Sequence, residues 1–469
     1  MSVDVMARRA GGVLLHLSSL PSPGGIGTMG QAARDFVDFL AQAGQSYWQL
    51  LPVCPTGYGN SPYQSPSSFA GNPYFIDLPA LCAEGLLTAD ELAEVEHDTE
   101  RVDYGWLFNT RYTVLRKAYS RFAGGKKYDS FCAKNAAWLD DYALFMALKG
   151  YYNHRAWTEW GAQHRDYERA KKWTADFAED IGFWKWVQYA FMTQWKALRK
   201  YAHSKKIVII GDMPIYVAHD SMDVWRNTKQ FLLDESFNPT VVAGCPPDSF
   251  SPDGQLWGNP IYNWELMKAE NFAWWCERVG AAFELYDILR IDHFRGFASF
   301  WAVGAKEETA RNGKWKKGPG MKLFDAVNKK LKNPSIIAED LGEFGKDVEN
   351  LLKDTGFAGM RVIQFGFDGK DNSHLPQNHP KNCIAYTGTH DNDTVLGWLY
   401  SIADDETRKL ALDYCGFKDW NWGEGGFYSR SVRAVIETVW RSPAALAIVP
   451  VQDMCGFGSD TRINVPGTP

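Results

Sequence analysis

The sequence lacks the features that define several classes of protein. Its eight cysteines are scattered, with no C-x-x-C pair and no histidine cluster at metal-ligand spacing. This argues against a disulfide framework or a zinc site and favours a reducing compartment, the cytoplasm. No window of about 18 apolar residues predicts a membrane span, and the apolar stretch 12–17 is too short for a secretory signal. A net charge of −6 gives no reason to expect a nucleic-acid or membrane partner.

Aromatic residues are the class that the sequence has in excess. It contains 20 Trp, 21 Tyr and 27 Phe, and together they make up 14% of the 469 residues. Such side chains can fill a large core, and they can also form surfaces that stack on flat apolar faces, which sugar rings present. Core packing explains most of them, so a sugar-binding function has to be argued from particular residues.

Short aliphatic runs along the chain predict buried parallel strands. These runs are apolar on both faces, are bounded by Gly, Pro or Asp, and are separated by helical patterns. They cover residues 12–17, 47–53, 206–212, 287–292, 335–340, 360–365, 383–388 and 445–453. Strands alternating with helices in this way indicate an α/β fold, a (β/α)8 TIM barrel.

Two connections between the predicted strands are too long for one crossover helix. We interpret residues 1–469 as one barrel domain with large insertions after strands 2 and 3. The first insertion covers 55–205, and the second covers 213–286 and carries a loop rich in Pro and Gly at 243–264. Both leave from carboxyl ends of strands, where barrel enzymes carry their active sites.

Acidic residues follow several of the predicted strands. These strand ends carry Asp212, then Arg290 with Asp292 and His293, then Glu339 with Asp340, then His390 with Asp391, and finally Asp453. Any single acidic residue there can cap the helix that follows. Capping does not explain a series of them with Arg and His interleaved, so we expect a catalytic cluster at the barrel mouth.

Two carboxyl groups are the machinery that breaks a glycosidic bond, and in retaining enzymes they lie about 5–5.5 Å apart. Asp292 and Glu339, on neighbouring predicted strands, are the natural pair. Arg290 lies two positions before Asp292, on the same face of the strand, where it would keep Asp292 ionised as a nucleophile. Glu339 would keep its proton as the acid. His390 and Asp391 would bind ring hydroxyls and stabilise developing positive charge.

Two other interpretations of these polar residues stay open. Hard cations bind oxygen ligands, so residues 368–372 and 391–394 could belong to a metal site, although neither segment has the spaced acidic loop of a calcium site. His293 and His390 could be ordinary histidines of the core. We favour a site without a metal.

Two loops combine aromatic residues with small polar ones, at 55–78 and 246–264. Gly and Pro favour tight turns there. Tyr58, Tyr63, Phe250, Trp257 and Tyr262 are candidates to stack on sugars, and Asn60, Ser61, Gln64, Asp248 and Gln255 are candidates to bond hydroxyls. The alternative is that these loops pack on themselves and cover the barrel rim.

Motifs along nearly the whole chain resemble the amylomaltase, or 4-α-glucanotransferase, family of the α-amylase superclan. The matching runs are LLHLSSLPSPGGIG, PTGYGNSPYQSPSSFAGNPYFIDL, IGDMPIYV, PPDSFSPDGQLWGNPIYNW, LRIDHFRGF, IAEDLG, THDNDT and GSDTRINVPGT. The resemblance implies a (β/α)8 barrel without a separate C-terminal β domain and without a cofactor. It also implies transfer of segments, with retention, between maltooligosaccharides and α-1,4-glucans.

The resemblance also implies roles for individual residues. Asp292 would be the nucleophile, Glu339 the general acid/base and Asp391 the third carboxylate, which stabilises the transition state. Asp212, Arg290 and His390 would support the sugar in the cleaved subsite, and Tyr58, Asp248, Phe250, Gln255 and Trp257 would line donor and acceptor subsites.

Two features depart from the family pattern. The chain ends at RINVPGTP, where relatives continue through a Gly-Asn-Trp segment, and Cys54 stands where a small residue without a thiol is expected. Two alternative functions stay open: an α-glucan hydrolase on the same scaffold, and a glucan-binding protein without catalysis.

Overall fold

Eight parallel strands, spread along the chain, form a barrel. In the computed structural model, which describes residues 8–97, 100–247, 251–342, 345–402 and 404–466, the strand order is β10-β11-β12-β1-β2-β3-β6-β9. The strands are β1 Ala10–Leu14, β2 Tyr47–Gln49, β3 Val208–Pro214, β6 Ile288–Asp292, β9 Ile336–Ala338, β10 Gly359–Val362, β11 Cys383–Tyr386 and β12 Leu446–Pro450. Each predicted strand overlaps one of these, so the predicted barrel is confirmed.

The barrel closes between β9 and β10. A β-bridge joins Ile337 to Ala358, and the Ala338 N–H donates to the Ala358 carbonyl at 2.9 Å. Inward-facing aliphatic side chains fill the barrel, among them Ile210, Ile288 and Ile384, which are fully buried. The interior is therefore a packed core, and the polar strand ends lie above it.

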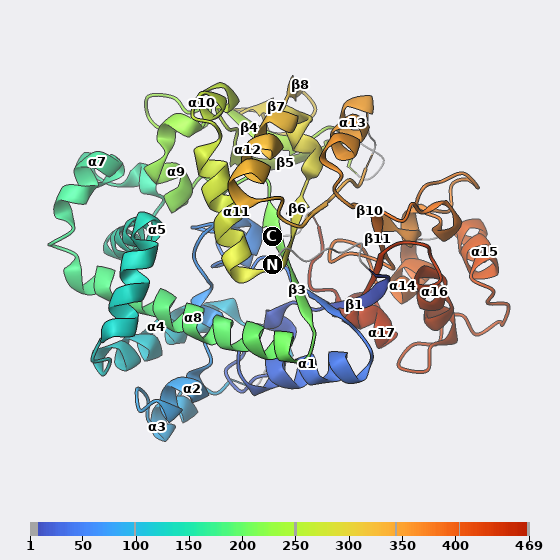
Figure 1. Cartoon of the computed structure of the whole chain (residues 1–469), viewed down its shortest axis with the longest axis horizontal. Helices are drawn as coiled ribbons and strands as arrows, with labels where there is room; N and C mark the ends of the chain where they lie inside the picture. The colour runs from blue at the N-terminus through green and yellow to red at the C-terminus, as the bar shows by residue number, and fades with distance from the viewer. Residues whose placement is uncertain (1–7, 98–99, 248–250, 343–344, 403, 467–469) are drawn as a thin grey trace.

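Helices surround the barrel and follow most of its strands (Figure 1), whereas only 3-10 turns connect β10 to β11. They are α1 Gln31–Gln42, α8 Ala178–Ser204, α11 Ala273–Leu285, α12 Met321–Leu331, α13 Lys346–Thr355, α16 Arg430–Trp440 and the short α17 Val451–Met454. Each lies where the sequence shows an apolar stripe at helical spacing or, for α17, directly after β12. No described helix has the length and apolar character needed to cross a bilayer.

The connection from β2 to β3 builds a large helical extension beside the barrel. It contains α2 Leu78–Ala83, α3 Ala89–Ala93, α4 Tyr104–Ser120, α5 Lys126–Tyr151, α6 Ala162–Arg165 and α7 Tyr167–Ala170 before α8 begins. The connection after β3 adds α9 Met222–Arg226 and α10 Trp264–Ala269. Fully buried tryptophans hold this region together, including Trp157, Trp186, Trp195 and Trp275. Many of the aromatic residues are therefore core, as expected.

A second, antiparallel sheet lies beside the barrel and was not predicted. Its order is β5-β4-β7-β8, with β4 Val241–Cys245, β5 Gln255–Pro260, β7 Ser299–Gly304 and β8 Lys314–Lys317. The first two strands come from the connection after β3, and the other two follow β6. Our expectation of a simple helical connection after the fourth barrel strand was thus incomplete.

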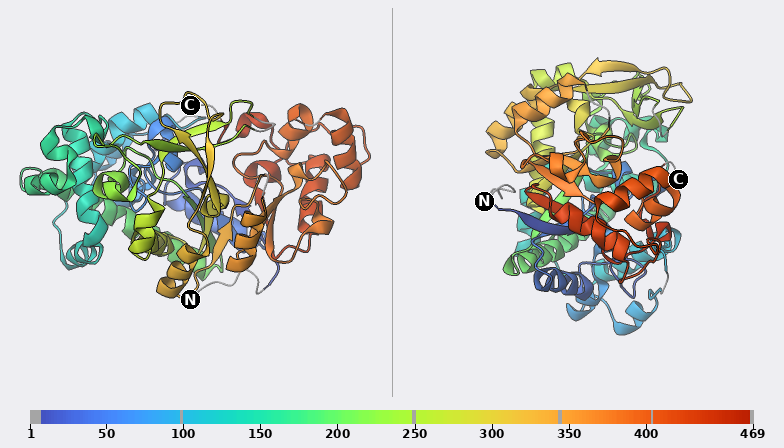
Figure 2. Two further views of the ribbon diagram at one scale, coloured as in Figure 1. Left: turned by 90° about the horizontal axis from the view of Figure 1, so that it is seen from above. Right: turned by 90° about the vertical axis from the view of Figure 1, so that its right-hand side faces the viewer.

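The connection after β11 forms another extension, on the side of the barrel opposite to α4 and α5 (Figures 1 and 2). It contains α14 Val395–Gly397, a π-helical turn Trp398–Ile402 and α15 Asp405–Tyr414, and it packs on α16 around a core of its own. Short 3-10 turns in the connection after β2 at Tyr58–Asn60 and Pro62–Gln64 bring the aromatic loop over the barrel.

Candidate active site

Arg290 lies between two carboxylates at the ends of neighbouring strands. In the parallel pairing of β3 with β6, Asp212 is opposite Arg290 and Pro214 is opposite Asp292. Arg290 Nη1 donates to both oxygens of Asp212 at 2.8 and 2.7 Å, and Arg290 Nη2 lies 3.0 Å from Asp292 Oδ1. Arg290 and Asp212 are buried, whereas the Asp292 side chain is 27% exposed. Only Asp292 of this trio therefore remains open to a ligand.

Glu339 follows β9 and faces Asp292 from the next strand. Its Oε2 accepts from the His293 N–H at 2.8 Å, and its Oε1 accepts from the Leu341 N–H at 2.6 Å. His293 adopts a left-handed conformation with φ 50° directly after β6, at the turn where its N–H meets Glu339. Two backbone donors thus hold the carboxyl group in one place.

The two carboxyl groups differ in how readily they ionise. Burial, and next the negative charge of Asp292, raise the pKa of Glu339, and Arg290 with the two backbone donors offsets only part of this. Burial also raises the pKa of Asp292, but less, because Arg290 opposes it at contact distance. Asp292 therefore loses its proton first, and Glu339 is the member of the pair that keeps one.

Tyr63 links the loop after β2 to two strand ends. Its hydroxyl donates to Asp212 Oδ2 at 2.8 Å and lies 2.8 Å from His390 Nε2, while the two rings stack 5.5 Å apart. A phenol has one hydrogen to give, so His390 donates from Nε2. Burial raises the pKa of Tyr63 well above its usual value, which keeps the phenol protonated.

Asp391 is the most exposed of the three predicted catalytic carboxylates. Its Oδ2 lies 3.3 Å from His390 Nε2, and its Oδ1 accepts from the Asn464 side-chain amide at 2.6 Å. Arg462 donates to the Asp391 backbone carbonyl at 3.0 Å. The sequence does not predict the contacts of Asn464 and Arg462, because isolated polar residues in a C-terminal segment carry no signal of their own.

The residues expected to bind sugar lie in different environments. Tyr58 is 85% exposed at the outer edge of its loop, and Trp257 on β5 meets the His293 ring edge-on at 4.7 Å and donates to the Gln255 side chain at 3.1 Å. Gln255 is exposed on the same strand. Asp248 and Phe250 lie outside the described residues.

Three candidates from the sequence are part of the structural framework. Tyr262 is buried and its hydroxyl donates to the Ile215 carbonyl, so it offers no face to a ligand. Asp340 accepts from the Met360 N–H and pairs with Arg361, and Asp453 accepts from Thr387 and from the Val395 N–H at the start of α14. Neither acid caps the helix that follows it, but both are bound by structural groups of neighbouring elements, so they are not part of the catalytic cluster.

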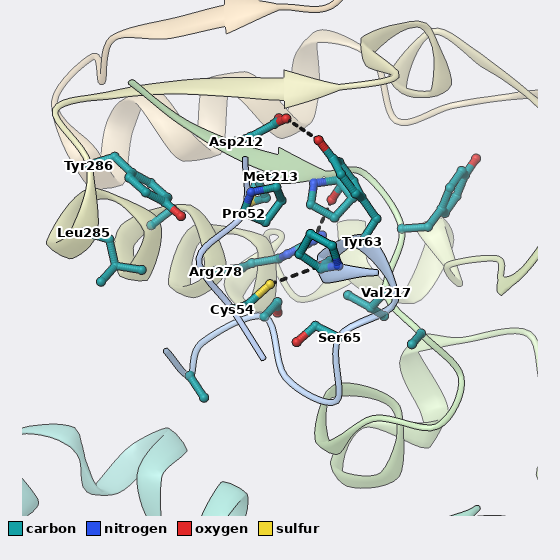
Figure 3. Close-up of a pocket in the computed structure, with 17 residues that line it drawn as sticks. Pro52, Cys54, Tyr63, Ser65, Asp212, Met213, Val217, Arg278, Leu285 and Tyr286 are labelled. Atoms are coloured by element: carbon teal, nitrogen blue, oxygen red, sulfur yellow. Dashed lines mark hydrogen bonds between the residues drawn. The ribbon is translucent and has the colours of Figure 1, made fainter. Parts of the chain in front are cut away.

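A small cavity of about 40 Å³ lies beside Asp212 and beneath the Tyr63 loop (Figure 3). Cys54 lines it, and the Cys54 thiol donates to the Pro62 carbonyl at 3.1 Å. Burial raises the pKa of this thiol to about 11, so it stays neutral at physiological pH. Cys54 therefore serves as a buried hydrogen-bond donor that holds the turn carrying Tyr63, which accounts for a residue that the sequence left unexplained.

Within the described parts of the chain, no group of three or more His, Cys, Asp or Glu residues could hold a metal ion. In the segment 368–372 the Asn372 side-chain amide donates to Asp368 at 2.6 Å, and the side chains of 391–394 also make protein contacts. Asn392 accepts from Thr389, and Asp393 accepts from Ser459. The arrangement of Asp292, Glu339 and Asp391 at the barrel mouth is suited to acid–base and nucleophilic chemistry by carboxyl groups.

The fold defines the class: a (β/α)8-barrel protein whose carboxyl groups gather at the carboxyl ends of the strands. The family model described as 4-alpha-glucanotransferase matches residues 15–469, and the chain belongs to this family. It is 48% identical to the 4-alpha-glucanotransferase of Clostridium butyricum, with 97% of this chain and 93% of that protein covered. It is 44% identical to the 4-alpha-glucanotransferase of Thermus thermophilus, with 98% and 93% covered.

Solved structures agree with this assignment. The amylomaltase of Streptococcus agalactiae in complex with acarbose matches with a TM-score of 0.92 at 39% identity, over 98% of this chain and 93% of that one. The amylomaltase of Corynebacterium glutamicum matches with a TM-score of 0.82 at 18% identity, over 99% of this chain and 70% of that one. The second likeness concerns the fold alone.

Proposed function

We propose that the protein is a 4-α-glucanotransferase that moves α-1,4-glucan segments between maltooligosaccharides by a retaining double displacement through a covalent glycosyl-enzyme. The observation that carries this is the asymmetry of the carboxyl pair. Asp292 is bound by Arg290 and open to a ligand, and Glu339 is held by backbone donors with a raised pKa. One group is prepared to attack, and its neighbour is prepared to give a proton.

In the first half of the reaction, Asp292 attacks the anomeric carbon of the donor. As the bond to Asp292 forms, the glycosidic bond breaks, and Glu339 gives its proton to the departing 4-oxygen. The part of the donor on the reducing-end side of the cleaved bond leaves with a free 4-hydroxyl, and the enzyme holds the other part as a glycosyl ester of Asp292. Positive charge develops on the ring during this step, and the carboxylate of Asp391 stabilises it.

In the second half, the acceptor replaces the leaving glucan. Glu339, now ionised, takes the proton from the 4-hydroxyl of an acceptor glucan, and that oxygen attacks the anomeric carbon and releases Asp292. Two inversions give net retention. Tyr63 and His390 hold the same hydrogen-bond network in both halves, because Tyr63 connects Asp212 to His390.

Transfer exceeds hydrolysis only if acceptor sugars are held at the ester while water is kept away. The candidates for this are the two aromatic loops, with Tyr58 on the first and Gln255 with Trp257 on β5, together with Asp248 and Phe250. The acarbose complex of the Streptococcus agalactiae relative supports a glucan-like ligand.

The substrates alone suffice for this chemistry, and we propose no metal or organic cofactor. We also propose that the enzyme works in the cytoplasm, since the described residues form no disulfide, which fits a reducing compartment.

The test is incubation with pure maltotriose and analysis of the products. A transferase yields glucose together with a ladder of longer oligosaccharides. Glucose and maltose alone would assign the chain to the hydrolases. Replacing Asp292 with Asn should abolish turnover while glucan binding persists, and a wild-type protein that binds glucan without turnover would support the binding-protein alternative instead.

A further inference from the structure

The loop 388–394 follows β11 and carries two residues of the proposed site, and one buried carboxylate holds both of its ends. Asp453, in α17 directly after β12, accepts through Oδ2 from the Thr387 hydroxyl at 2.6 Å. Through Oδ1 it accepts from the Val395 N–H at 2.7 Å. Thr387 directly follows β11, and Val395 is the first residue of α14. The proposed reaction makes no use of Asp453, yet its two oxygens fix the point where the loop leaves the barrel and the point where it enters the next helix.

A second side chain holds the same region from the opposite flank. Gln364, in the 3-10 turn after β10, donates from Nε2 to the Thr387 carbonyl at 3.1 Å and to the Asp393 carbonyl at 2.9 Å. In the sheet, β10 and β12 are the two neighbours of β11. A Cβ on Gly388 would come within 3.0 Å of Gln364 Nε2, so the amide fits closely against the loop. We call Asp453 and Gln364 the clamp residues.

Burial strengthens both clamp residues. Asp453, Gln364 and Thr387 are buried, so water does not compete for their hydrogen bonds. Burial raises the pKa of Asp453 to about 6, and its two hydrogen-bond donors offset part of this rise. Above pH 7 the carboxylate is therefore mostly ionised, and its hydrogen bonds are of the stronger, charge-assisted kind. Moving either end of the loop away would leave a buried charge short of a donor, which is costly.

Between its ends, the loop is held together by bonds of its own. The Asn392 side chain accepts from the Thr389 N–H and from the Thr389 hydroxyl, both at 2.9 Å. The Thr389 hydroxyl in turn accepts from the Asp391 N–H at 3.2 Å. The loop is thus a compact unit, and a shift of its ends carries Asp391 with it. A misplacement of about 1 Å at a reacting centre can lower a rate by about 10²-fold.

We propose that Asp453 and Gln364 are positioning residues for the reaction, which fix the loop 388–394 and thereby set the place of the Asp391 carboxylate against the sugar ring. The proposal deepens the proposed function and rests on it for the role of Asp391. That role belongs to the transition state, where positive charge develops on the ring. Loss of a clamp residue therefore lowers kcat and leaves KM nearly unchanged.

A role in fold stability alone would give a different result, and Asp77 provides the matched control. Its Oδ1 accepts from the Thr28 hydroxyl at 2.8 Å, and its Oδ2 accepts from the Ala80 N–H at 3.1 Å at the start of α2. Asp77 thus makes the same pair of bonds as Asp453, but in the extension after β2. Replacing it tests what the loss of such a carboxylate costs the fold without a link to the loop 388–394.

The experiment is a double-mutant cycle between Asp453→Ala and Asp391→Asn, with Asp77→Ala as the control. Release of fluoride from α-maltotriosyl fluoride gives kcat and KM, and thermal unfolding scans report on the fold. Each turnover releases one fluoride whether the acceptor is a sugar or water, so the measurement does not depend on the transferase assignment. Thr387→Val, which keeps the shape of the side chain and removes its hydroxyl, replaces Asp453→Ala if that variant does not fold.

We expect Asp453→Ala to lower kcat about 10²-fold and to change KM less than about twofold. In the Asp391→Asn background the same substitution should lower kcat less than about fivefold, because the group that Asp453 positions is already lost. Asp453→Asn can accept from Val395 and donate to the Thr387 oxygen, so it should keep most of the wild-type kcat. Asp77→Ala should lower the thermal midpoint and leave kcat unchanged.

Four results would overturn the proposal. They are an equal loss of kcat in the wild-type and Asp391→Asn backgrounds, a rise in KM at unchanged kcat, a loss in Asp453→Asn as large as in Asp453→Ala, and the same loss of kcat in Asp77→Ala. A ladder of products from maltotriose without coupling between Asp453 and Asp391 would keep the proposed function and reject the clamp. Coupling in an enzyme that gives only glucose and maltose would keep the clamp and reject the transferase.

Discussion

The Asn464 side-chain amide donates a hydrogen bond to Asp391 Oδ1 at 2.6 Å across 73 positions of sequence. Arg462, two residues earlier, donates to the Asp391 backbone carbonyl. The C-terminal segment therefore orients the Asp391 side chain from the solvent side, while His390 lies near its other oxygen. The position of this carboxylate depends on parts of the chain that follow strands β11 and β12.

Replacing Asn464 with Ala should lower kcat/KM about tenfold with little change in the thermal midpoint, because the contact lies at the exposed rim and its loss misplaces Asp391 without disturbing the core. Steady-state kinetics with maltotriose and a thermal unfolding scan measure both. Asn312→Ala is the matched control, since the Asn312 amide donates to Glu307 on an exposed turn. Equal losses in the two variants would contradict an orienting role for Asn464.

Replacing Glu339 with Gln should reduce transfer from maltotriose by about 10²–10⁴-fold, the usual contribution of a general acid/base. With an α-glucosyl donor whose leaving group departs without protonation, the first step should recover, and a burst of that leaving group should appear. The burst is measured by rapid mixing. A variant equally impaired with both donors would place the acid elsewhere.

The same substitution tests the pH dependence of stability. The Glu339 pKa lies above its unfolded value near 4.5, so between these two values the folded state holds a proton that the unfolded state has released. The free energy of unfolding therefore falls as pH rises through this range. Glu339→Gln removes this pH dependence. The thermal midpoint of the variant should therefore rise relative to that of the wild type as pH increases from about 5 to 9. A constant difference across this range would mean that the pKa of Glu339 is not raised.

Replacing Arg290 with Met should destabilise the fold by about 3–5 kcal/mol, because the buried Asp212 then loses its cation and keeps only the hydrogen bond from Tyr63. The remaining activity should need a higher pH, since the loss of the cation raises the pKa of Asp292 and the nucleophile ionises later. Denaturant unfolding and the acid limb of kcat/KM measure the two effects. In both measurements Arg290→Lys, which keeps a charge but not the bidentate geometry, should lie between the wild type and Arg290→Met. If the acid limb of kcat/KM does not shift, Arg290 does not lower the pKa of Asp292.

The barrel strands and most helices could be predicted because each is a local pattern. The runs around Ile209, Ile291 and Ile337 are apolar on both faces, which is what a strand buried between a core and a layer of helices requires. The second sheet has no such signal. Its edge strand Lys314–Lys317 reads KWKK and is exposed along its length, and β5 contains Gly and Pro. Its pairing depends on tertiary contacts alone.

The candidate site was partly predictable for the same reason. Asp292 and Glu339 follow apolar runs, so their place at the barrel mouth could be inferred from the order of strands. The bridge made by Tyr63 could not, because its partners Asp212 and His390 are 149 and 327 positions away. Asp340 and Asp453 carry the same local signal as the carboxyl pair, and only their hydrogen bonds show that they are structural.

The sparse backbone pairing between β9 and β10 has a consequence for the order in which the enzyme unfolds. Besides the bridge at Ile337, the side chain of Asp340 holds this seam through the Met360 N–H and Arg361. Local opening should begin where backbone pairing is sparse, so we expect the amide hydrogens of β9 and β10 to exchange with deuterium before those of β1 and β12. Glu339 follows β9 directly. On warming, Glu339, the proposed acid/base, should therefore lose its position while the rest of the barrel is still folded.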